Sequence, residues 1–177
     1  GLALAFTTAL GTAEGTDITF ETASPLTFAG TSGEVENVEL TIKGDTIVED
    51  NETFTITLGA ITAATAEQTD SLSHADSPAT GTIGNDDSAT LTLSIPTITE
   101  SNVDQTVNAT VTLSAEVEAG FDLNFTTALG SAEATDVTFV TTSPLSFAGT
   151  AGEVENVELT IKGDTIVEDN ETFTITL

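Results

Sequence analysis

The sequence predicts an all-β protein made of antiparallel β-sandwich modules in tandem. Apolar and polar residues alternate with a period of two over many short segments, which is the pattern of half-buried strands. Thr, Val, Ile and Phe, which favour strands, are frequent, whereas Gly, Pro, Asn and Asp separate the segments. No segment shows a sustained period of 3.6 residues. Seven or so short strands with such turns therefore indicate a sandwich.

A tandem repeat organises the chain. The segment GDTIVEDNETFTITL occurs at residues 44–58 and again at residues 163–177, which gives a period of 119 residues. Residues 1–58 and residues 120–177 are identical at 48 of 58 aligned positions. Such self-similarity at a fixed period is typical of repeat proteins.

The run Asn85-Asp86-Asp87 before Ser88 predicts a junction between two modules. Residues 1–87 are then the C-terminal part of one module, without its first strands. Residues 88–177 are the N-terminal part of the next module, without its last strand. Both parts would expose an unpaired sheet edge, which either further repeats of the same chain or neighbouring chains complete.

Alternation also places the individual strands. Val157, Leu159 and Ile161 face one way, while the polar residues between them face the other. Ile95 and Leu177 continue the apolar faces of the segments in which they lie. The expected strands cover residues 80–83, 89–95, 107–113, 123–125, 137–139, 157–161 and 173–177.

The charge of the chain limits its partners. It carries 29 acidic residues against only Lys43 and Lys162, a formal net charge of −27. Nucleic-acid binding needs clustered Lys and Arg, and an anionic membrane surface would repel this chain, so neither is expected as a partner. No apolar run approaches the roughly 18 residues of a membrane helix. The expected partner of so acidic a surface is a cation.

The carboxylates gather at turns. Asp17 and Asp136 end the turns EGTD and EATD, and the acidic segment GDTIVEDNE follows a strand in both copies. Glu100 lies in PTITES, and the pair Asp86-Asp87 closes the first module. Calcium takes six to eight oxygen ligands, mostly carboxylates and backbone carbonyls from converging loops. The pattern therefore predicts calcium binding by these turns.

These motifs together resemble the Calx-beta domain. They comprise a strand followed by GD-x3-E-x2-ETF-x3-L, a preceding A-x-x-TD turn and a closing TIxNDD, and they cover essentially the whole sequence. The resemblance implies an immunoglobulin-like sandwich with Ca2+ bound at one end, beside the following module. The metal ligands that it implies are Asp17, Asp45, Glu49, Asp86 and Asp87 in the first module and Glu100, Asp136, Asp164 and Glu168 in the second, with Glu52 and Glu171 as further candidates.

The motifs also depart from the family pattern. Gly44 and Gly163 stand where the family often has a second acid, and Asn85 replaces one acid of the closing run. Each change removes ligand charge, so fewer or weaker ions are expected than in other members of the family.

Other interpretations compete with calcium binding. One is that the acids only cap turns and keep the surface soluble. His74 is the only histidine, and without Cys or a second His it is expected to be an exposed loop residue, not a zinc ligand. Paired carboxylates also occur in glycosidases, but the chain has no Trp or Tyr to form a sugar platform. We therefore expect no enzymatic activity.

The expected function is that of a calcium-binding repeat in a bacterial cell-surface protein. Near-identical tandem modules suit a stalk, spacer or adhesin body, with neighbouring repeats end to end and ions stiffening the junctions. A surface or glycan ligand would bind elsewhere in the protein. One alternative is a subunit of an extracellular filament, in which a neighbour's strand completes each sandwich. Another is a calcium sensor, although a sensor rarely needs an array of copies.

Overall fold

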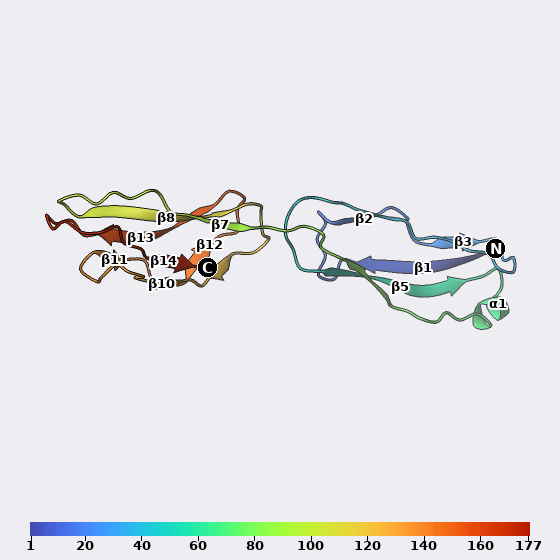
Figure 1. Ribbon diagram of the computed structural model, residues 1–177. Helices are drawn as coiled ribbons and strands as arrows, with labels where there is room; N and C mark the ends of the chain where they lie inside the picture. Colours follow the sequence, from blue (N-terminus) through green and yellow to red (C-terminus); the bar gives the residue numbers. More distant parts are fainter. The chain divides into compact units, whose positions relative to one another are not determined.

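The computed structural model describes residues 1–177 and confirms an almost entirely β structure. It contains strands β1 to β14 and one short helix, α1 (Figure 1). The chain divides into two compact units. The first comprises residues 1–45 and 50–85, and the second comprises residues 86–177 together with the short segment 46–49.

The first unit is built around a four-stranded antiparallel sheet of order β3-β1-β5-β6. Strands β2 and β4 form a separate two-stranded sheet. The element bounds are β1 Leu2–Ala9, β2 Ile18–Phe20, β3 Leu26–Phe28, β4 Leu40–Ile42, β5 Glu52–Thr62, α1 Ala66–Asp70 and β6 Ala79–Ile83. Helix α1 lies between β5 and β6, where Thr65 caps it by accepting a hydrogen bond from the Gln68 N–H at 3.3 Å.

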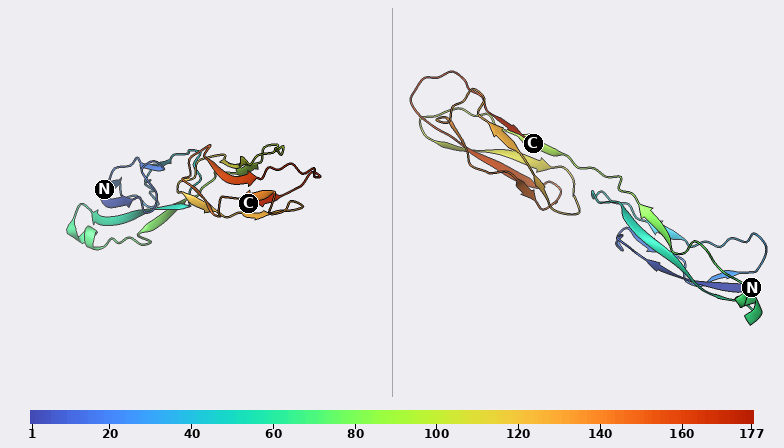
Figure 2. Two further views of the ribbon diagram at one scale, coloured as in Figure 1. Left: turned by 90° about the vertical axis from the view of Figure 1, so that its left-hand side faces the viewer. Right: turned by 90° about the horizontal axis from the view of Figure 1, so that it is seen from below.

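In the second unit the sheets are divided differently. Four strands form one antiparallel sheet of order β11-β13-β8-β7, and the pairs β12-β9 and β10-β14 form two smaller sheets. Figure 2 shows the strands from two further sides. The element bounds are β7 Leu91–Ser94, β8 Gln105–Leu113, β9 Phe121–Leu123, β10 Thr126–Ala128, β11 Val137–Phe139, β12 Leu145–Phe147, β13 Val154–Ile161 and β14 Thr174–Thr176.

The core of the second unit confirms the predicted alternation. Val157 and Leu159 on β13 and Ala109 and Val111 on β8 have no exposed surface. The register places Val157 opposite Ala109 and Leu159 opposite Val107. The four-stranded sheet therefore has one dry face, formed by every second residue, and the polar residues between them face outward.

The first unit has a smaller core, although the local packing of the two copies is alike. The apolar side chains buried in this unit are Phe6, Ala13, Ile18 and Leu26. Phe20 and Phe54 meet edge to face with ring centroids 5.9 Å apart, and their repeat counterparts Phe139 and Phe173 do the same at 5.9 Å. The difference in core size therefore arises elsewhere in the unit.

One segment of identical sequence has two structures. EVENVELTI occurs at residues 34–42 and at residues 153–161. In the second copy it forms the eight-residue β13, paired on both edges, whereas in the first copy only the three residues of β4 are paired, and only with β2. Ile161 is 8% exposed and its counterpart Ile42 is 46% exposed. Strand length here depends on the partner strand and not on the local sequence.

The structure corrects one of the predicted apolar faces. Ile95 lies one residue beyond the end of β7 and is 39% exposed. Alternation continues past β7 in the sequence, but a residue beyond the last ladder bond has no neighbouring strand to cover it. No helix of the structure is long and apolar enough to cross a membrane.

Candidate metal centres

The A-x-x-TD turn holds an aspartate in the same way in both copies. In the second copy, the Asp136 carboxylate accepts hydrogen bonds from the Glu133 N–H at 2.6 Å and from the Thr135 hydroxyl at 3.1 Å. In the first copy, the Asp17 carboxylate accepts one from the Glu14 N–H at 2.5 Å. A carboxylate has about four lone-pair sites, so each aspartate is oriented by its turn and keeps capacity for a ligand.

Backbone contacts bring a glutamate to the same place. The Thr172 N–H donates to the Ser131 hydroxyl at 2.9 Å, and the Ala132 N–H donates to the Thr172 carbonyl at 3.1 Å. The first copy repeats both bonds, at 2.8 Å and 3.1 Å. These bonds fix the residue after the acidic loop against the turn, so Glu171 lies beside Asp136.

The second copy gathers Asp136, Glu168 and Glu171 into one group. Each offers a carboxylate oxygen, and the three oxygens lie within 4.8 Å of one another. They line an open hollow of about 380 Å³, whose wall also includes Glu100 and Asn170. Asp136 is half-buried and the two glutamates are exposed, so the group is accessible to a small ion.

The crowding of these carboxylates shifts their pKa values apart. Loss of solvent and then the negative charges of Asp164 and Asp136 raise the pKa of Glu168, and Glu100 adds to the same effect. Loss of solvent and a hydrogen bond with Asp136 raise the pKa of Glu171. The backbone hydrogen bond of its turn holds the pKa of Asp136 below the ordinary value. A cation in the hollow would offset the repulsion that these shifts report.

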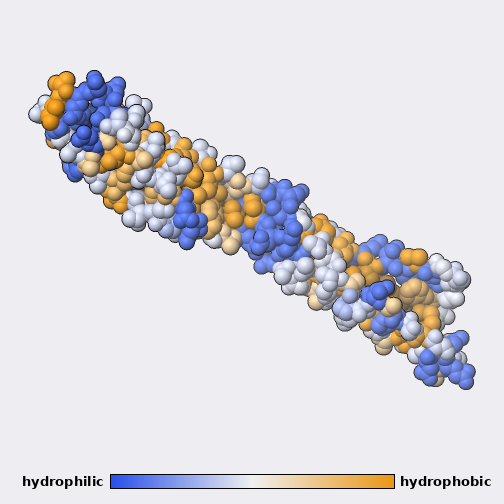
Figure 3. Space-filling view, turned by 60° about the horizontal axis from the view of Figure 1, so that its bottom comes forward, coloured by the Kyte–Doolittle hydropathy of each residue, from blue (hydrophilic) through white to orange (hydrophobic).

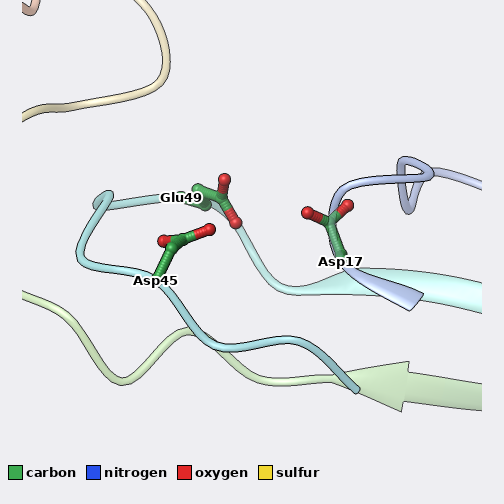
Figure 4. A group of neighbouring side chains, drawn as sticks. All are labelled: Asp17, Asp45 and Glu49. Atoms are coloured by element: carbon green, nitrogen blue, oxygen red, sulfur yellow. The ribbon is translucent and has the colours of Figure 1, made fainter. Parts of the chain in front are cut away.

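The first copy gathers Asp17, Asp45 and Glu49. Their carboxylate oxygens also lie within 4.8 Å of one another, and the side chains point toward a shared space from the turn and from the loop after β4 (Figure 4). Asp17 is 5% exposed, and it forms a hydrogen bond with Glu52, which is 8% exposed. Burial favours the neutral form of Asp17, but the hydrogen bonds with the Glu14 N–H and Glu52 outweigh it and lower its pKa.

Both groups consist only of predicted ligands, but not every predicted ligand joins them. Asp164 and Glu100 lie close enough to Glu168 to raise its pKa, and the Asp164 carboxylate accepts the Ile166 N–H at 2.6 Å. Asp86, which is exposed, and Asp87, which is half-buried, belong to neither group.

The two groups use overlapping but different repeat positions. The first includes Asp45 and not Glu52, whereas the second includes Glu171, the counterpart of Glu52, and not Asp164, the counterpart of Asp45. Glu52 is buried and forms a hydrogen bond with Asp17, whereas its counterpart Glu171 is exposed. The repeat therefore offers four carboxylate positions around one space, of which each copy brings three together.

Three residues near the second group are not among the predicted ligands. Asp169 and Asn170 line the hollow, and the charge of Glu133 helps to raise the pKa of Glu168. All three lie within the motifs that identified the ligands, so their position in the acidic turns was the available signal.

The donor set fits calcium. Calcium ligands lie 2.3–2.6 Å from the ion, so two of them on opposite sides are about 5 Å apart at most. The 4.8 Å spread of each group meets this limit. Carboxylate oxygens without nitrogen or sulfur donors favour a hard cation over zinc or copper. Backbone carbonyls, the Asn170 amide and water are available to complete a coordination number of six or more.

Comparison with known families confirms the resemblance. The model of the family described as Calx-beta domain matches residues 2–87 and again residues 84–177. No curated protein matches the chain. Calx-beta domains are non-catalytic β-sandwich repeats associated with calcium binding. Each matched region contains one of the two acidic groups.

Proposed function

The chain belongs to the Calx-beta domain family, and from this premise we propose that it is a calcium-binding repeat of a bacterial cell-surface protein, acting as a stalk, spacer or adhesin body. The observation that carries the proposal is the recurrence of a three-carboxylate group in both copies of the repeat. The residues that would hold Ca2+ are Asp17, Asp45 and Glu49 in the first module and Asp136, Glu168 and Glu171 in the second.

The second group combines one carboxylate held by its turn with two carboxylates on an exposed loop. Asp136 is held by its turn, whereas Glu168 and Glu171 are exposed on the loop between β13 and β14. Loss of solvent, and after it the charges of neighbouring carboxylates, raise the pKa values of both glutamates, so this loop conformation carries an electrostatic cost at neutral pH. Binding of Ca2+ offsets that cost, so the ion stabilises the loop in the conformation that closes the site.

Weak sites suffice for this role outside a cell. Extracellular calcium-binding modules have dissociation constants of roughly 10⁻⁴–10⁻³ M. Near-identical repeats let the length of a stalk change without altering any one site. Ions at the module junctions would neutralise clustered carboxylates and stiffen the array, because the net charge of −27 otherwise opposes close approach of modules.

Thermal unfolding of the 177-residue chain tests the proposal. It is followed by far-UV circular dichroism in about 10 mM CaCl2 and in chelator. Dissociation constants of roughly 10⁻⁴–10⁻³ M give a stabilisation of about 1.4–2.7 kcal/mol per site at that concentration. The double substitution Asp136→Asn, Glu168→Gln should remove the gain of the second module. The matched control Glu118→Gln, an exposed acid outside both groups, should keep it.

Calorimetry and small-angle scattering distinguish calcium binding from stiffening of the array. Calorimetric titration without heat, together with melting curves that ignore calcium, would mean that the acids only cap turns. If calcium binds, small-angle scattering on a multi-repeat protein should show a longer maximum dimension with calcium than with chelator. Equal dimensions would overturn the stiffening role and leave calcium binding intact.

A filament subunit is the second candidate function. The outer edges of β6 and β7, each of which is paired on one side only, favour it, because such an edge can accept a strand from another molecule. Denaturing conditions distinguish the two candidates. A stalk stays one long chain, whereas a filament dissociates into short subunits.

A further inference from the structure

Lys162 is the only basic residue of the second unit, and it lies at the wall of the acidic hollow. Hydrophilic residues gather in patches on the face of the molecule that Figure 3 shows, and in this unit every other charged residue is acidic. The backbone N–H of Lys162 donates to the Asp136 carbonyl at 2.7 Å, so the lysine is anchored beside a member of the second group. The same carboxylates therefore attract both this tethered ammonium and a calcium ion.

The ammonium of Lys162 pairs with a carboxylate outside that group. Its Nζ lies 2.9 Å from Asp104 Oδ2, and the other oxygen of this carboxylate accepts a hydrogen bond from the Gly163 N–H at 3.1 Å. Asp104 belongs neither to the three-carboxylate group nor to the lining of the hollow. The hydrogen bond with Lys162, and after it that with the Gly163 N–H, lower the pKa of Asp104. At neutral pH an ionised Asp104 thus draws the ammonium to itself.

The loop that carries Asp104 is held in place by its own hydrogen bonds. The Ser101 hydroxyl donates to the Val103 carbonyl at 2.9 Å, and the Gln105 side-chain amide donates to the Ser101 hydroxyl at 3.0 Å. A Cβ at position 163 would overlap the backbone of Ser101 and Val103, so Gly163 is what lets the loop approach this closely. Asp104 is therefore a fixed partner beside the start of the acidic segment.

A lysine at this repeat position also reaches the turn that holds the aspartate. In the first copy, the Lys43 Nζ donates to the Gly15 carbonyl at 2.7 Å, two residues before Asp17. In both copies the backbone N–H of the lysine donates to the carbonyl of the turn aspartate at 2.7 Å, so the turn lies in the same place relative to both lysines. The Lys162 side chain is 42% exposed, and rotation of its bonds is enough to bring the ammonium to the acidic group.

We propose that Asp104 is a positioning residue of the second metal centre, which holds Lys162 away from the acidic group and so leaves that group to a divalent cation. Without Asp104, the ammonium competes with Ca2+ for the carboxylates of Asp136, Glu168 and Glu171. Ion pairs between exposed side chains are weak, so we expect Asp104→Asn to raise the dissociation constant of this site for Ca2+ about two- to fivefold. The inference rests on the proposed calcium binding and names a residue that tunes it.

The test is a titration of the 177-residue chain with CaCl2, followed by the NMR amide signals of residues 164–171, which report on the second site. A double-mutant cycle of Asp104→Asn and Lys162→Gln isolates the contribution of the lysine. Asparagine at position 104 keeps an oxygen for the Gly163 N–H but no longer attracts the ammonium. Asp104→Asn should weaken binding about two- to fivefold when Lys162 is present, and by less than about 1.5-fold in the Lys162→Gln background. Equal losses in the two backgrounds would mean that Asp104 acts only on the loop, and would overturn the inference.

The lysine side chains give a second readout, which does not depend on affinity. The chain has only two lysines and no arginine, so selective ¹³C labelling gives two sets of side-chain signals, which Lys162→Gln assigns. In Asp104→Asn, calcium should displace the ammonium from the acidic group and shift the Lys162 signals at least about twice as far as in the unaltered chain. Lys162 signals that ignore calcium in this variant would contradict the proposal. Glu118→Gln removes one exposed acid elsewhere, and as the matched control it should behave like the unaltered chain.

The outcomes also separate this inference from the proposed function. If calcium leaves the signals of residues 164–171 of the unaltered chain unchanged, both are wrong. If the unaltered chain binds calcium and the cycle shows no coupling between Asp104 and Lys162, calcium binding stands and only the role of Asp104 is lost. The two side chains are 54% and 42% exposed, so neither substitution opens a cavity in the core, and circular dichroism without calcium checks that each variant keeps the β structure.

Discussion

Leu40 and Leu159 occupy the same repeat position within an identical segment, so truncating each to alanine isolates the effect of burial. Leu159 has no exposed surface and lies in the main core cluster, and Leu→Ala at such positions costs about 2–5 kcal/mol because a cavity remains. Leu40 is half-buried on a strand with one partner, so its truncation leaves no closed cavity. From the lost transfer free energy alone we expect about 1 kcal/mol.

The assay is urea or thermal unfolding followed by far-UV circular dichroism, because the chain contains no Trp or Tyr for fluorescence. A cost of about 3 kcal/mol in the second unit lowers its melting temperature by roughly 12–24 °C, against roughly 4–8 °C for Leu40→Ala in the first. Hydrogen exchange on separate peptides assigns each transition to its unit. Equal costs at the two positions would refute the reasoning, because they would mean that β4 is as well covered in solution as β13.

Two further predictions concern turns. The carboxylates of Glu34 and Glu153 each accept three backbone N–H groups at 2.7–3.2 Å, which lowers their pKa from 4.5. The stability that these ionised carboxylates contribute is therefore present above pH 4.5 and is lost as the pH falls through the lowered pKa. Glu153→Gln should reduce the stability at pH 7. It should also make the melting temperature depend less on pH in the acid range, which melting curves at several pH values measure. Gly130 and Gly152 both have positive φ, at 67° and 77°. Gly152→Ala places its Cβ in open space and should lower the free energy of unfolding by about 1–2 kcal/mol. Gly130→Ala should lower it further, because its Cβ would overlap the Thr172 carbonyl oxygen. Equal urea midpoints for the two variants would contradict this reasoning.

Much of the fold followed from the sequence because its determinants are local and repeated. Alternation identified Val157, Leu159 and Ile161 as one face, and all three are buried. The extent of a strand did not follow, because it depends on a partner elsewhere in the chain. The segment that forms β13 forms only the shorter β4 when no strand equivalent to β8 lies beside it.

The acidic groups show the same division. The motifs contain all members of both groups, because these carboxylates lie at turns whose spacing the sequence displays. The motifs did not show that Asp45 joins one group while its counterpart Asp164 stays outside the other. That choice depends on rotamers of exposed loop residues, which a pattern of residue types does not specify. Asp86 and Asp87 remain predicted ligands without a place in either group.

The open edge of β4 also bears on the colloidal behaviour of the protein. An unpaired strand is a template for uncontrolled aggregation, and natural proteins protect such edges with charged gatekeeper residues. Glu36 and Glu39, both exposed, lie just before and beside β4 and repel a second acidic strand while they are ionised. The protection is weakest near the isoelectric point of about 4.1, where the chain as a whole also stops repelling its copies. The surface charge that attracts cations thus also keeps copies of the chain apart and in solution.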